Sequence, residues 1–305
     1  MRTELLYLYD DRKDVTLKAY LLEDNVNLRP KKTLPAIIIN PGGGYMYCSP
    51  REAEPIALRF NAMGYHAFVL EYSVYGEGKY PFELDSDLPV KEHSLFPHAM
   101  QEIAMSFELI HQHAAEWKVD TNQIGTIGFS AGGHNVAMYA NNWNTPVIQD
   151  AVSLKGDALK PAFNIVGYPL TDLINITANI EDLNTVAEAK PILIACFGKS
   201  DVSQAELEYY SPARNVNSDT PPTFIWTTSE DQVVAAQDSI QLALGLAHNN
   251  IPFELHVFEK GPHGLSLANP STARAAEHIN PKAATWAEMA EKWLNDRFPV
   301  EALDM

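Results

Sequence analysis

Ile124-Gly125-Thr126-Ile127-Gly128-Phe129-Ser130-Ala131-Gly132-Gly133-His134 is an apolar run that ends in Gly-x-Ser-x-Gly and continues as a helical pattern. This spacing predicts a sharp strand-to-helix turn with Ser130 at its tip, where glycines at Gly128 and Gly132 avoid collision with the turning backbone. The turn leaves the hydroxyl exposed near a helix N-terminus, whose free amides favour a developing negative charge. Ser130 is therefore a candidate nucleophile and the Ala131 amide a candidate oxyanion donor. The alternative is an ordinary turn with a capping serine, so residues elsewhere must decide.

The composition limits the size of the fold and the class of partner. The chain has 305 residues, of which 46% are hydrophobic and 20% charged, which suits one large α/β domain with a sizeable core or two small domains. Its 22 lysines and arginines stand against 39 aspartates and glutamates, so the formal net charge is −17. This charge repels nucleic acid and anionic membrane surfaces, so we expect neither as a partner.

Two sequence features bear on location. Cys48 and Cys196 are the only cysteines, and Met1-Arg2-Thr3-Glu4 leads into no long apolar segment of the kind that a secretory signal needs. No apolar run approaches the roughly 20 residues of a membrane span. We therefore expect a reduced, cytoplasmic protein without a membrane segment.

Apolar runs alternate with helical patterns along most of the chain. The predicted strands are Leu5–Tyr9, Val15–Leu22, Leu34–Ile39, Tyr65–Tyr72, Ile124–Phe129, Ala162–Tyr168, Pro222–Thr228 and Pro252–Phe258. Helical patterns follow residue 52, Pro97 and Ser130, an amphipathic helix is predicted over Ile240–Ala247, and a closing helix is predicted over Ala283–Phe298 with Trp286, Met289 and Trp293 inward. This alternation predicts an α/β fold with a mostly parallel sheet, helices on both faces and an antiparallel hairpin at its N-terminal edge.

The first predicted buried strand runs directly into Asn40-Pro41-Gly42-Gly43-Gly44-Tyr45. Consecutive glycines adopt backbone angles forbidden to other residues and leave their amides unshielded, so this loop can direct N–H groups at an anionic oxygen. A flexible connector is the alternative, but the pairing with the Ser130 turn favours an oxyanion-binding loop. Immediately after it, Ser49-Pro50-Arg51-Glu52 predicts a capping box at the start of a helix.

Two long segments interrupt the strand and helix rhythm. Residues 73–95 carry glycine, proline and aromatics without a period, and Tyr75, Tyr80 and Phe82 are predicted to line a pocket there. Residues 170–220 are predicted to be an inserted cap within a single 1–305 domain, with a second capping box at Ser203 and Glu206. Within the cap, Pro191–Cys196 fits a strand or a helix, and the sequence leaves the choice open.

An acyl-transferring serine needs an imidazole to accept its proton and a carboxylate to orient that imidazole. Glu230 and Asp231 directly follow the Pro222–Thr228 strand, and we choose Asp231. His263 lies in Gly261-Pro262-His263-Gly264, after the last long strand. Alone, Asp231 is typical of a turn cap and His263 of a surface loop. Their placement after consecutive strands, in the chain order Ser, Asp, His, predicts a catalytic triad.

The remaining histidines do not predict a metal site. His111 and His113 are two residues apart on a helix and face different sides, and the chain lacks a His-Glu-x-x-His helix or paired cysteines. His134, one turn beyond Ser130, is expected to pack or cap. We expect no metal and no cofactor.

Together these motifs resemble the acetylxylan-esterase-like and feruloyl-esterase-like members of the α/β-hydrolases, over roughly residues 30 to 300. In that family an Asp-x-x-Val pattern carries the acid, which matches Asp231 and Val234. The resemblance implies Ser130 as nucleophile, His263 as base, and Gly43 and Gly44 beside Ala131 as oxyanion donors. Related lipases begin the glycine loop with histidine, where this chain has Pro41.

The expected function is therefore hydrolysis of a small ester substrate, with short acyl groups on carbohydrates implied by the sugar-deacetylating relatives. A serine oligopeptidase uses the same triad, but no propeller-sized domain precedes the fold. A binding protein on a hydrolase scaffold would carry a broken triad, whereas all three residues are present. A homodimer is one arrangement open to a sheet with exposed edges.

Overall fold

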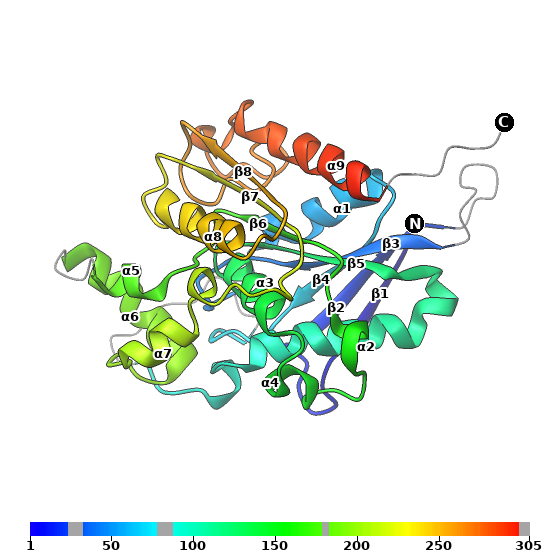
Figure 1. Ribbon diagram of the computed structural model, residues 1–305, viewed down its shortest axis with the longest axis horizontal. Coiled ribbons are helices and arrows are strands. Elements are labelled where there is room, and N and C mark those ends of the chain that lie inside the picture. The colour runs from blue at the N-terminus through cyan, green and yellow to red at the C-terminus, as the bar shows by residue number, and fades with distance from the viewer. Residues whose placement is uncertain (24–32, 78–87, 179–182, 299–305) are drawn as a thin grey trace.

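Eight strands form one twisted sheet within residues 1–23, 33–77, 88–178 and 183–298, which a computed structural model of the chain describes (Figure 1). The spatial order is β1-β2-β4-β3-β5-β6-β7-β8. The strands are β1 Arg2–Tyr7, β2 Thr16–Leu21, β3 Leu34–Asn40, β4 His66–Glu71, β5 Val119–Phe129, β6 Asn164–Gly167, β7 Thr223–Thr228 and β8 Phe253–Phe258.

The pairing of the strands confirms the predicted α/β class. The hairpin β1–β2 is antiparallel and adds to β4 in antiparallel register, whereas β4, β3, β5, β6, β7 and β8 run parallel to one another. Parallel strands need crossover connections, which the helices between them supply. The chain has the α/β-hydrolase fold, with an antiparallel N-terminal edge.

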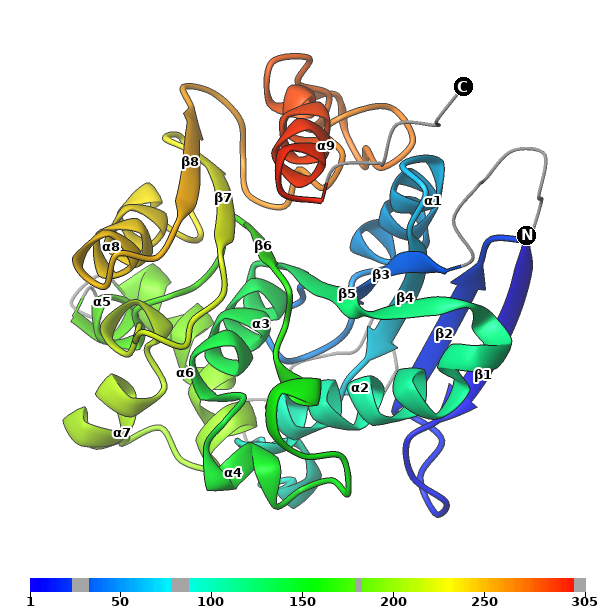
Figure 2. The ribbon, with the colours of Figure 1, turned by 45° about the vertical axis from the view of Figure 1, so that its right-hand side comes forward.

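Helices cover both faces of this sheet, as Figure 2 shows. The α-helices are α1 Glu54–Ala62, α2 His98–Trp117, α3 Ala131–Asn142, α4 Pro146–Gln149, α5 Leu173–Ala178, α6 Leu183–Phe197, α7 Gln204–Tyr209, α8 Ala236–His248 and α9 Trp286–Arg297. Helices α1 and α9 pack on the face that carries Ile37 and Ile39, and α2, α3 and α8 pack on the face that carries Ile38. Alternate residues of β3 thus enter two separate cores, as a strand buried on both faces requires.

Three local predictions need correction. Ser49 caps nothing with its side chain: Pro50–Glu52 is a single turn of 3₁₀-helix, and Glu52 points inward instead of closing a capping box. Tyr75 is buried in the core with its hydroxyl donating to the Pro89 carbonyl and does not border the cavity at Ser130 described below, and Tyr80 and Phe82 lie outside the described residues. The ambiguous stretch Pro191–Cys196 belongs to helix α6.

The segment between β6 and β7 holds α5, α6 and α7, gathered beside α8 at one end of the sheet (Figures 1 and 2). The predicted capping box at Ser203 and Glu206 is confirmed at the start of α7, where both reciprocal hydrogen bonds form. The sequence rule therefore succeeds here and fails at Ser49, because the Glu206 side chain is 39% exposed and finds no competing partner in the interior.

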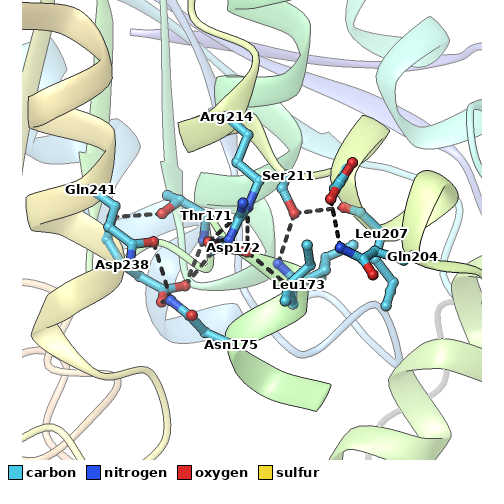
Figure 3. Close-up of polar contacts among 12 residues, drawn as sticks. Thr171, Asp172, Leu173, Asn175, Gln204, Leu207, Ser211, Arg214, Asp238 and Gln241 are labelled. Carbon is cyan, nitrogen blue, oxygen red and sulfur yellow. Dashed lines mark hydrogen bonds and ion pairs between the residues drawn. The ribbon is translucent and has the colours of Figure 1, made fainter. Parts of the chain in front are cut away.

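A buried polar network joins this segment to α8, as Figure 3 shows. One carboxylate oxygen of Asp238 accepts the backbone amides of Thr171 and Asp172, at 2.8 and 3.2 Å. The Asp172 side chain is only 1% exposed and accepts the Arg214 guanidinium, with an Nη2–Oδ2 distance of 2.8 Å. Burial raises the pKa of Asp238 to about 6, and the neighbouring charge of Asp172 acts in the same direction.

No helix within the described residues combines the length and the apolar character needed to cross a membrane.

Candidate active site

Ser130 occupies the turn between β5 and α3 in a backbone conformation that is rare for a residue with a side chain, with φ 52° and ψ −120°. Its amide donates to the Gly167 carbonyl at 3.0 Å, and its own carbonyl accepts the His134 amide at 2.9 Å. These bonds hold the strained turn in place. The Ser130 side chain makes no capping hydrogen bond to α3, so its hydroxyl remains available for other partners.

The two glycines of the motif are required by close backbone approach. A Cβ on Gly128 would lie 2.1 Å from the Gly132 carbonyl oxygen, and a Cβ on Gly132 would lie 2.1 Å from the Asn40 carbonyl oxygen. No side chain fits at either distance, so the sequence Gly-x-Ser-x-Gly is the local cause of the turn.

His263 and Asp231 meet Ser130 at the same edge of the sheet. The His263 Nε2 atom lies 2.8 Å from Ser130 Oγ, and His263 Nδ1 lies 2.7 Å from Asp231 Oδ2. Ser130 follows β5, Asp231 follows β7 and His263 follows β8, so the ends of three parallel strands bring together residues distant in sequence. A carboxylate only accepts hydrogen bonds, so the Asp231 contact favours the tautomer with its proton on Nδ1.

Asp231 is held by its own loop. Its Oδ1 atom accepts the backbone amides of Val233 and Val234, each at 2.9 Å, and its side chain is only 1% exposed. Glu230, the other acidic residue after β7, instead accepts the Gly261 amide. The turn-cap interpretation of Asp231 is therefore correct for one oxygen, while the second oxygen contacts His263.

The glycine loop after β3 borders the same site. Gly43 and Gly44 have φ values of 131° and 62°, and a Cβ on Gly43 would lie 2.0 Å from the Tyr47 carbonyl oxygen. Within the described part of the chain, the backbone amides of Gly43, Gly44 and Ala131 donate to no protein acceptor. The Gly42 amide, in contrast, is already bound to Glu52. The three predicted donor amides are thus free of protein acceptors among the described residues.

Glu52 connects the glycine loop to the floor of the site. One of its oxygens accepts the Gly42 amide at 2.7 Å, and the other accepts the Tyr168 hydroxyl at 2.5 Å. The Tyr168 ring packs edge-on against the His263 imidazole, with 5.0 Å between ring centroids. Burial raises the pKa of Tyr168 well above its ordinary value, so this phenol stays protonated and remains a donor.

His134, the other histidine near Ser130, is fully buried as expected. Its Nδ1 lies 2.6 Å from the Tyr45 hydroxyl and its Nε2 lies 2.7 Å from the Tyr210 carbonyl, while Phe96 stacks on its ring. Burial lowers the pKa of His134 to about 4, so it is neutral near pH 7. It fixes the glycine loop to α3 through Tyr45 and does not reach Ser130.

A cavity of about 480 Å³ opens over the Ser130 hydroxyl. Its lining residues are Gly43, Gly44, Tyr47, Ser49, Pro50, Arg51, Glu52, Ser130, Val233, His263, Gly264, Arg274 and His278. We expected segments 73–95 and 170–220 to build this pocket. Among the described residues neither contributes to its lining, which comes instead from the glycine loop, the turn after it and residues 263–278.

Sequence reasoning missed Glu52, Tyr168, Arg51, Arg274 and His278. Glu52 fits a local capping pattern with Ser49. Its actual partners, the Gly42 amide and the Tyr168 hydroxyl, come close to it only in the folded chain. The stretch that carries Arg274 and His278 has no hydrophobic period, and only its position after His263 is a signal. No group of three or more histidine, cysteine or acidic side chains suited to a metal occurs in the ranges that the structure describes.

This arrangement is suited to acyl transfer. An imidazole within hydrogen-bond distance of a hydroxyl can accept its proton, and a buried carboxylate on the far nitrogen stabilises the imidazolium that results. Free amides beside the hydroxyl, including one at a helix N-terminus, are suited to an oxyanion.

Comparison with known proteins agrees with the fold. The model of the BD-FAE family matches residues 25–246. Endo-1,4-beta-xylanase B from Butyrivibrio fibrisolvens is 30% identical over 258 residues, which cover 83% of this chain. The match covers 35% of the xylanase, so the chain spans about a third of that relative's length.

Two solved structures match nearly the whole chain. The carboxylesterase Cest-2923 from Lactobacillus plantarum WCFS1 is 27% identical with a TM-score of 0.77, and the match covers 98% of both chains. An acetyl ester-xyloside bifunctional hydrolase from Caldicellulosiruptor lactoaceticus is 26% identical with a TM-score of 0.74, and 97% of both chains is covered.

Proposed function

The chain belongs to the BD-FAE family, and we propose that it is a serine carboxylesterase that hydrolyses short-chain esters, acetyl esters of carbohydrates in particular. The observation that carries the proposal is the continuous hydrogen-bonded series from Asp231 through His263 to Ser130, with both distances below 3 Å. In this proposal Ser130 is the nucleophile, His263 the general base and Asp231 the residue that orients the imidazole.

The first half of the reaction forms an acyl-enzyme. His263 Nε2 accepts the Ser130 hydroxyl proton while Oγ attacks the ester carbonyl carbon, and the carbonyl oxygen becomes an oxyanion. Asp231 stabilises the imidazolium without itself taking the proton. When the tetrahedral intermediate collapses, the imidazolium returns its proton to the departing alcohol oxygen, and Ser130 keeps the acyl group.

The oxyanion is stabilised by the Ala131 amide together with that of Gly43 or Gly44. All three donors are free and rigidly placed, and the first lies at the N-terminus of α3. Preorganised donors of this kind require no rearrangement as charge develops, which makes each worth about a hundredfold to a thousandfold in turnover.

Water completes the cycle. His263 removes a proton from a water molecule as its oxygen attacks the acyl carbon, a second tetrahedral intermediate forms against the same amides, and the acid leaves as Ser130 recovers its proton. The open cavity over Ser130 gives water and the alcohol access to this position.

The substrate class is supported by the relatives. One is a xylanase and another is described as an acetyl ester-xyloside hydrolase, so acetyl groups on xylose-type sugars are the first substrates to test.

Substitution of the nucleophile tests the proposal. We expect Ser130→Ala to lower the turnover of p-nitrophenyl acetate by at least about 10⁴-fold, as for other triad nucleophiles. The unfolding transition should change little, because Ala fits where no capping bond is lost. Hydrolysis at the wild-type rate by this variant would refute the mechanism.

Two further measurements separate the alternatives. Covalent labelling by a fluorophosphonate probe, lost in Ser130→Ala, is expected of an enzyme and not of a binding protein. Faster cleavage of aminoacyl-naphthylamides than of p-nitrophenyl acetate would favour the oligopeptidase class instead.

The proposal extends to organisation and location. We propose one domain in which 170–220 forms a cap, since Asp238 on α8 accepts the backbone amides of Thr171 and Asp172 and so attaches that segment to the sheet-bearing part. A single calorimetric unfolding transition would agree, and two separated transitions would not. Both cysteines are free thiols, as expected in the cytoplasm, and cell fractionation tests that location.

A further inference from the structure

One side of the cavity over Ser130 is lined by basic side chains. Arg51, Arg274 and His278 border the same space as Ser130 and His263. The proposed hydrolysis of a neutral acetyl ester uses none of the three. Such a group of basic side chains contrasts with the chain as a whole, whose formal net charge is −17.

Arg51 is held rigidly next to the imidazole. Its Nε atom donates to the Thr272 carbonyl, and the Ser266 hydroxyl donates to the Arg51 carbonyl. Its Nη1 atom lies 3.7 Å from the position that a Cβ on Gly264 would occupy, and Gly264 directly follows His263. The guanidinium group is therefore fixed at the wall of the cavity, close to the reacting atoms.

This guanidinium group has a donor without a protein partner. Arg51 Nη2 is buried, and no acceptor for it exists among the residues that the structure describes. A buried donor attached to a charged group is costly to leave unpaired, so such groups in native proteins usually have a ligand or another specific function. The planar guanidinium fork matches the two oxygens of a carboxylate.

The cavity lining carries two arginines against one acidic residue, Glu52. Arg274 is exposed and forms no ion pair with any described carboxylate. The pKa of His278 is lowered by burial and then by the positive charges of Arg51 and Arg274, and Glu277 opposes this only in part. Glu52, the acidic residue in the lining, has one oxygen on the Gly42 amide and the other on the Tyr168 hydroxyl.

We propose that Arg51 and Arg274 form a carboxylate-binding subsite, so that the preferred ester substrates carry a carboxylate on their acyl or their alcohol part. The guanidinium groups of Arg51 and Arg274, which both border the cavity, bind the carboxylate, and the polar edge of His278 lies beside them. This inference rests on the proposed esterase function and specifies its substrate class. An overall negative protein repels such substrates at long range, so local cations are needed to hold one.

Matched ester pairs test the subsite. For the alcohol part, the pair is mono-O-acetylated methyl glucuronoside and mono-O-acetylated methyl glucoside. For the acyl part, it is the p-nitrophenyl half-ester of succinic acid and p-nitrophenyl 4-methylpentanoate, after subtraction of the spontaneous rates. The readout is the ratio of kcat/KM for the anionic ester to that for the neutral ester, and the pair with the higher wild-type ratio identifies which part carries the carboxylate.

We expect Arg51→Gln to lower this ratio about tenfold or more, as for loss of a hydrogen bond to a charged group, and Arg274→Gln to lower it about threefold to tenfold. Arg274→Lys should retain most of the ratio. Lys292→Gln is the matched control, because it removes the same charge from an exposed position on α9 that does not line the cavity. Its ratio should equal that of the wild type.

The outcomes distinguish this inference from the function on which it rests. Ester hydrolysis with the same ratio in wild type and Arg274→Gln, for both pairs, would overturn the subsite and leave the esterase intact. No hydrolysis of any of the four esters by the wild type would overturn both. Because Arg274 is exposed and makes no ion pair, its variants test the subsite even where Arg51→Gln fails to fold.

Discussion

Two buried aspartates on either side of the start of α8 share one kind of backbone contact and differ in the partner of their second carboxylate oxygen. Asp231 and Asp238 each place one carboxylate oxygen on two consecutive backbone amides, those of Val233 and Val234 and those of Thr171 and Asp172. The second oxygen of Asp231 lies 2.7 Å from the His263 imidazole, whereas that of Asp238 lies 3.5 Å from the Asn175 amide.

The difference lies in what the second partner can do. An imidazole can take and return a proton, and an amide cannot. In the proposed mechanism, a carboxylate that would otherwise only shape a loop takes part in the reaction because its free oxygen faces His263. In Figure 3, by contrast, the Asp238 oxygens lie among amides and the Asp172–Arg214 pair, which suits attachment of the proposed cap.

The largest expected effect comes from Asp231→Asn. The amide retains an acceptor for the two loop amides but favours the wrong imidazole tautomer, so kcat should fall by roughly 10⁴-fold, as in other triads. Hydrolysis of p-nitrophenyl acetate measures this loss. A loss within tenfold would mean that the two aspartates do not differ as proposed.

Asp238→Ala should lower the stability of the protein and leave its activity nearly unchanged. It leaves the buried amides of Thr171 and Asp172 without an acceptor, so the free energy of unfolding should fall by about 2–4 kcal/mol. Activity at a temperature where the variant is folded should stay within about threefold of the wild type. Urea unfolding measures the first effect, with exposed Asp296→Ala as the control for a lost negative charge.

The pH dependence of stability sharpens the comparison. The pKa of Asp238 is raised to about 6 from 3.8 by burial, so between these values the folded chain binds a proton that the unfolded chain has released. Stability from this group is complete below the unfolded pKa and is lost as pH rises through the folded one. Relative to Asp238→Asn, the wild type should lose about 2 kcal/mol between about pH 4 and pH 7.

Denaturant titration of both proteins at several pH values checks this expectation. A stability difference that is constant with pH, or that grows as pH rises, would contradict it.

The smallest effect is expected at Asn175. Its contact with Asp238 is long, at 3.5 Å, and its bond to the Gln241 side chain, at 3.1 Å, is only partly buried, so Asn175→Ala should change the free energy of unfolding by about 1 kcal/mol or less. Thermal unfolding measures this change. A loss as large as that of Asp238→Ala would show that the second oxygen matters as much in the cap network as in the active site.

The sequence predicts the fold and the three convergent side chains because their causes are local. Gly128 and Gly132 enforce the turn at Ser130 by steric exclusion, and strand ends locate Asp231 and His263 without knowledge of other contacts. The prediction for Glu52 was wrong because it also rested on neighbouring residues alone. Its pattern with Ser49 satisfies a capping rule, but Gly42 and Tyr168 offer buried partners that no neighbouring residue reveals.

The cavity lining could not be predicted for a related reason. Residues 264–278 have neither hydrophobic period nor motif, so their return over the site depends on tertiary packing. Trp286, whose indole donates to the Ser266 carbonyl, is part of that packing. Likewise Pro191–Cys196 is apolar in a way that suits either element, and its position in α6 is decided by neighbours in the fold.

Glu52 accepts hydrogen bonds from both the Gly42 amide and the Tyr168 hydroxyl, and this limits how the site can be engineered. Because a single carboxylate supports both the loop of donor amides and the phenol beneath the imidazole, exchange of residue 52 would disturb oxyanion binding and proton transfer at once. Directed evolution of altered substrate preference should therefore keep position 52 fixed and randomise the rim at Tyr47, Val233 and Arg274, where the lining can change without moving the reacting groups.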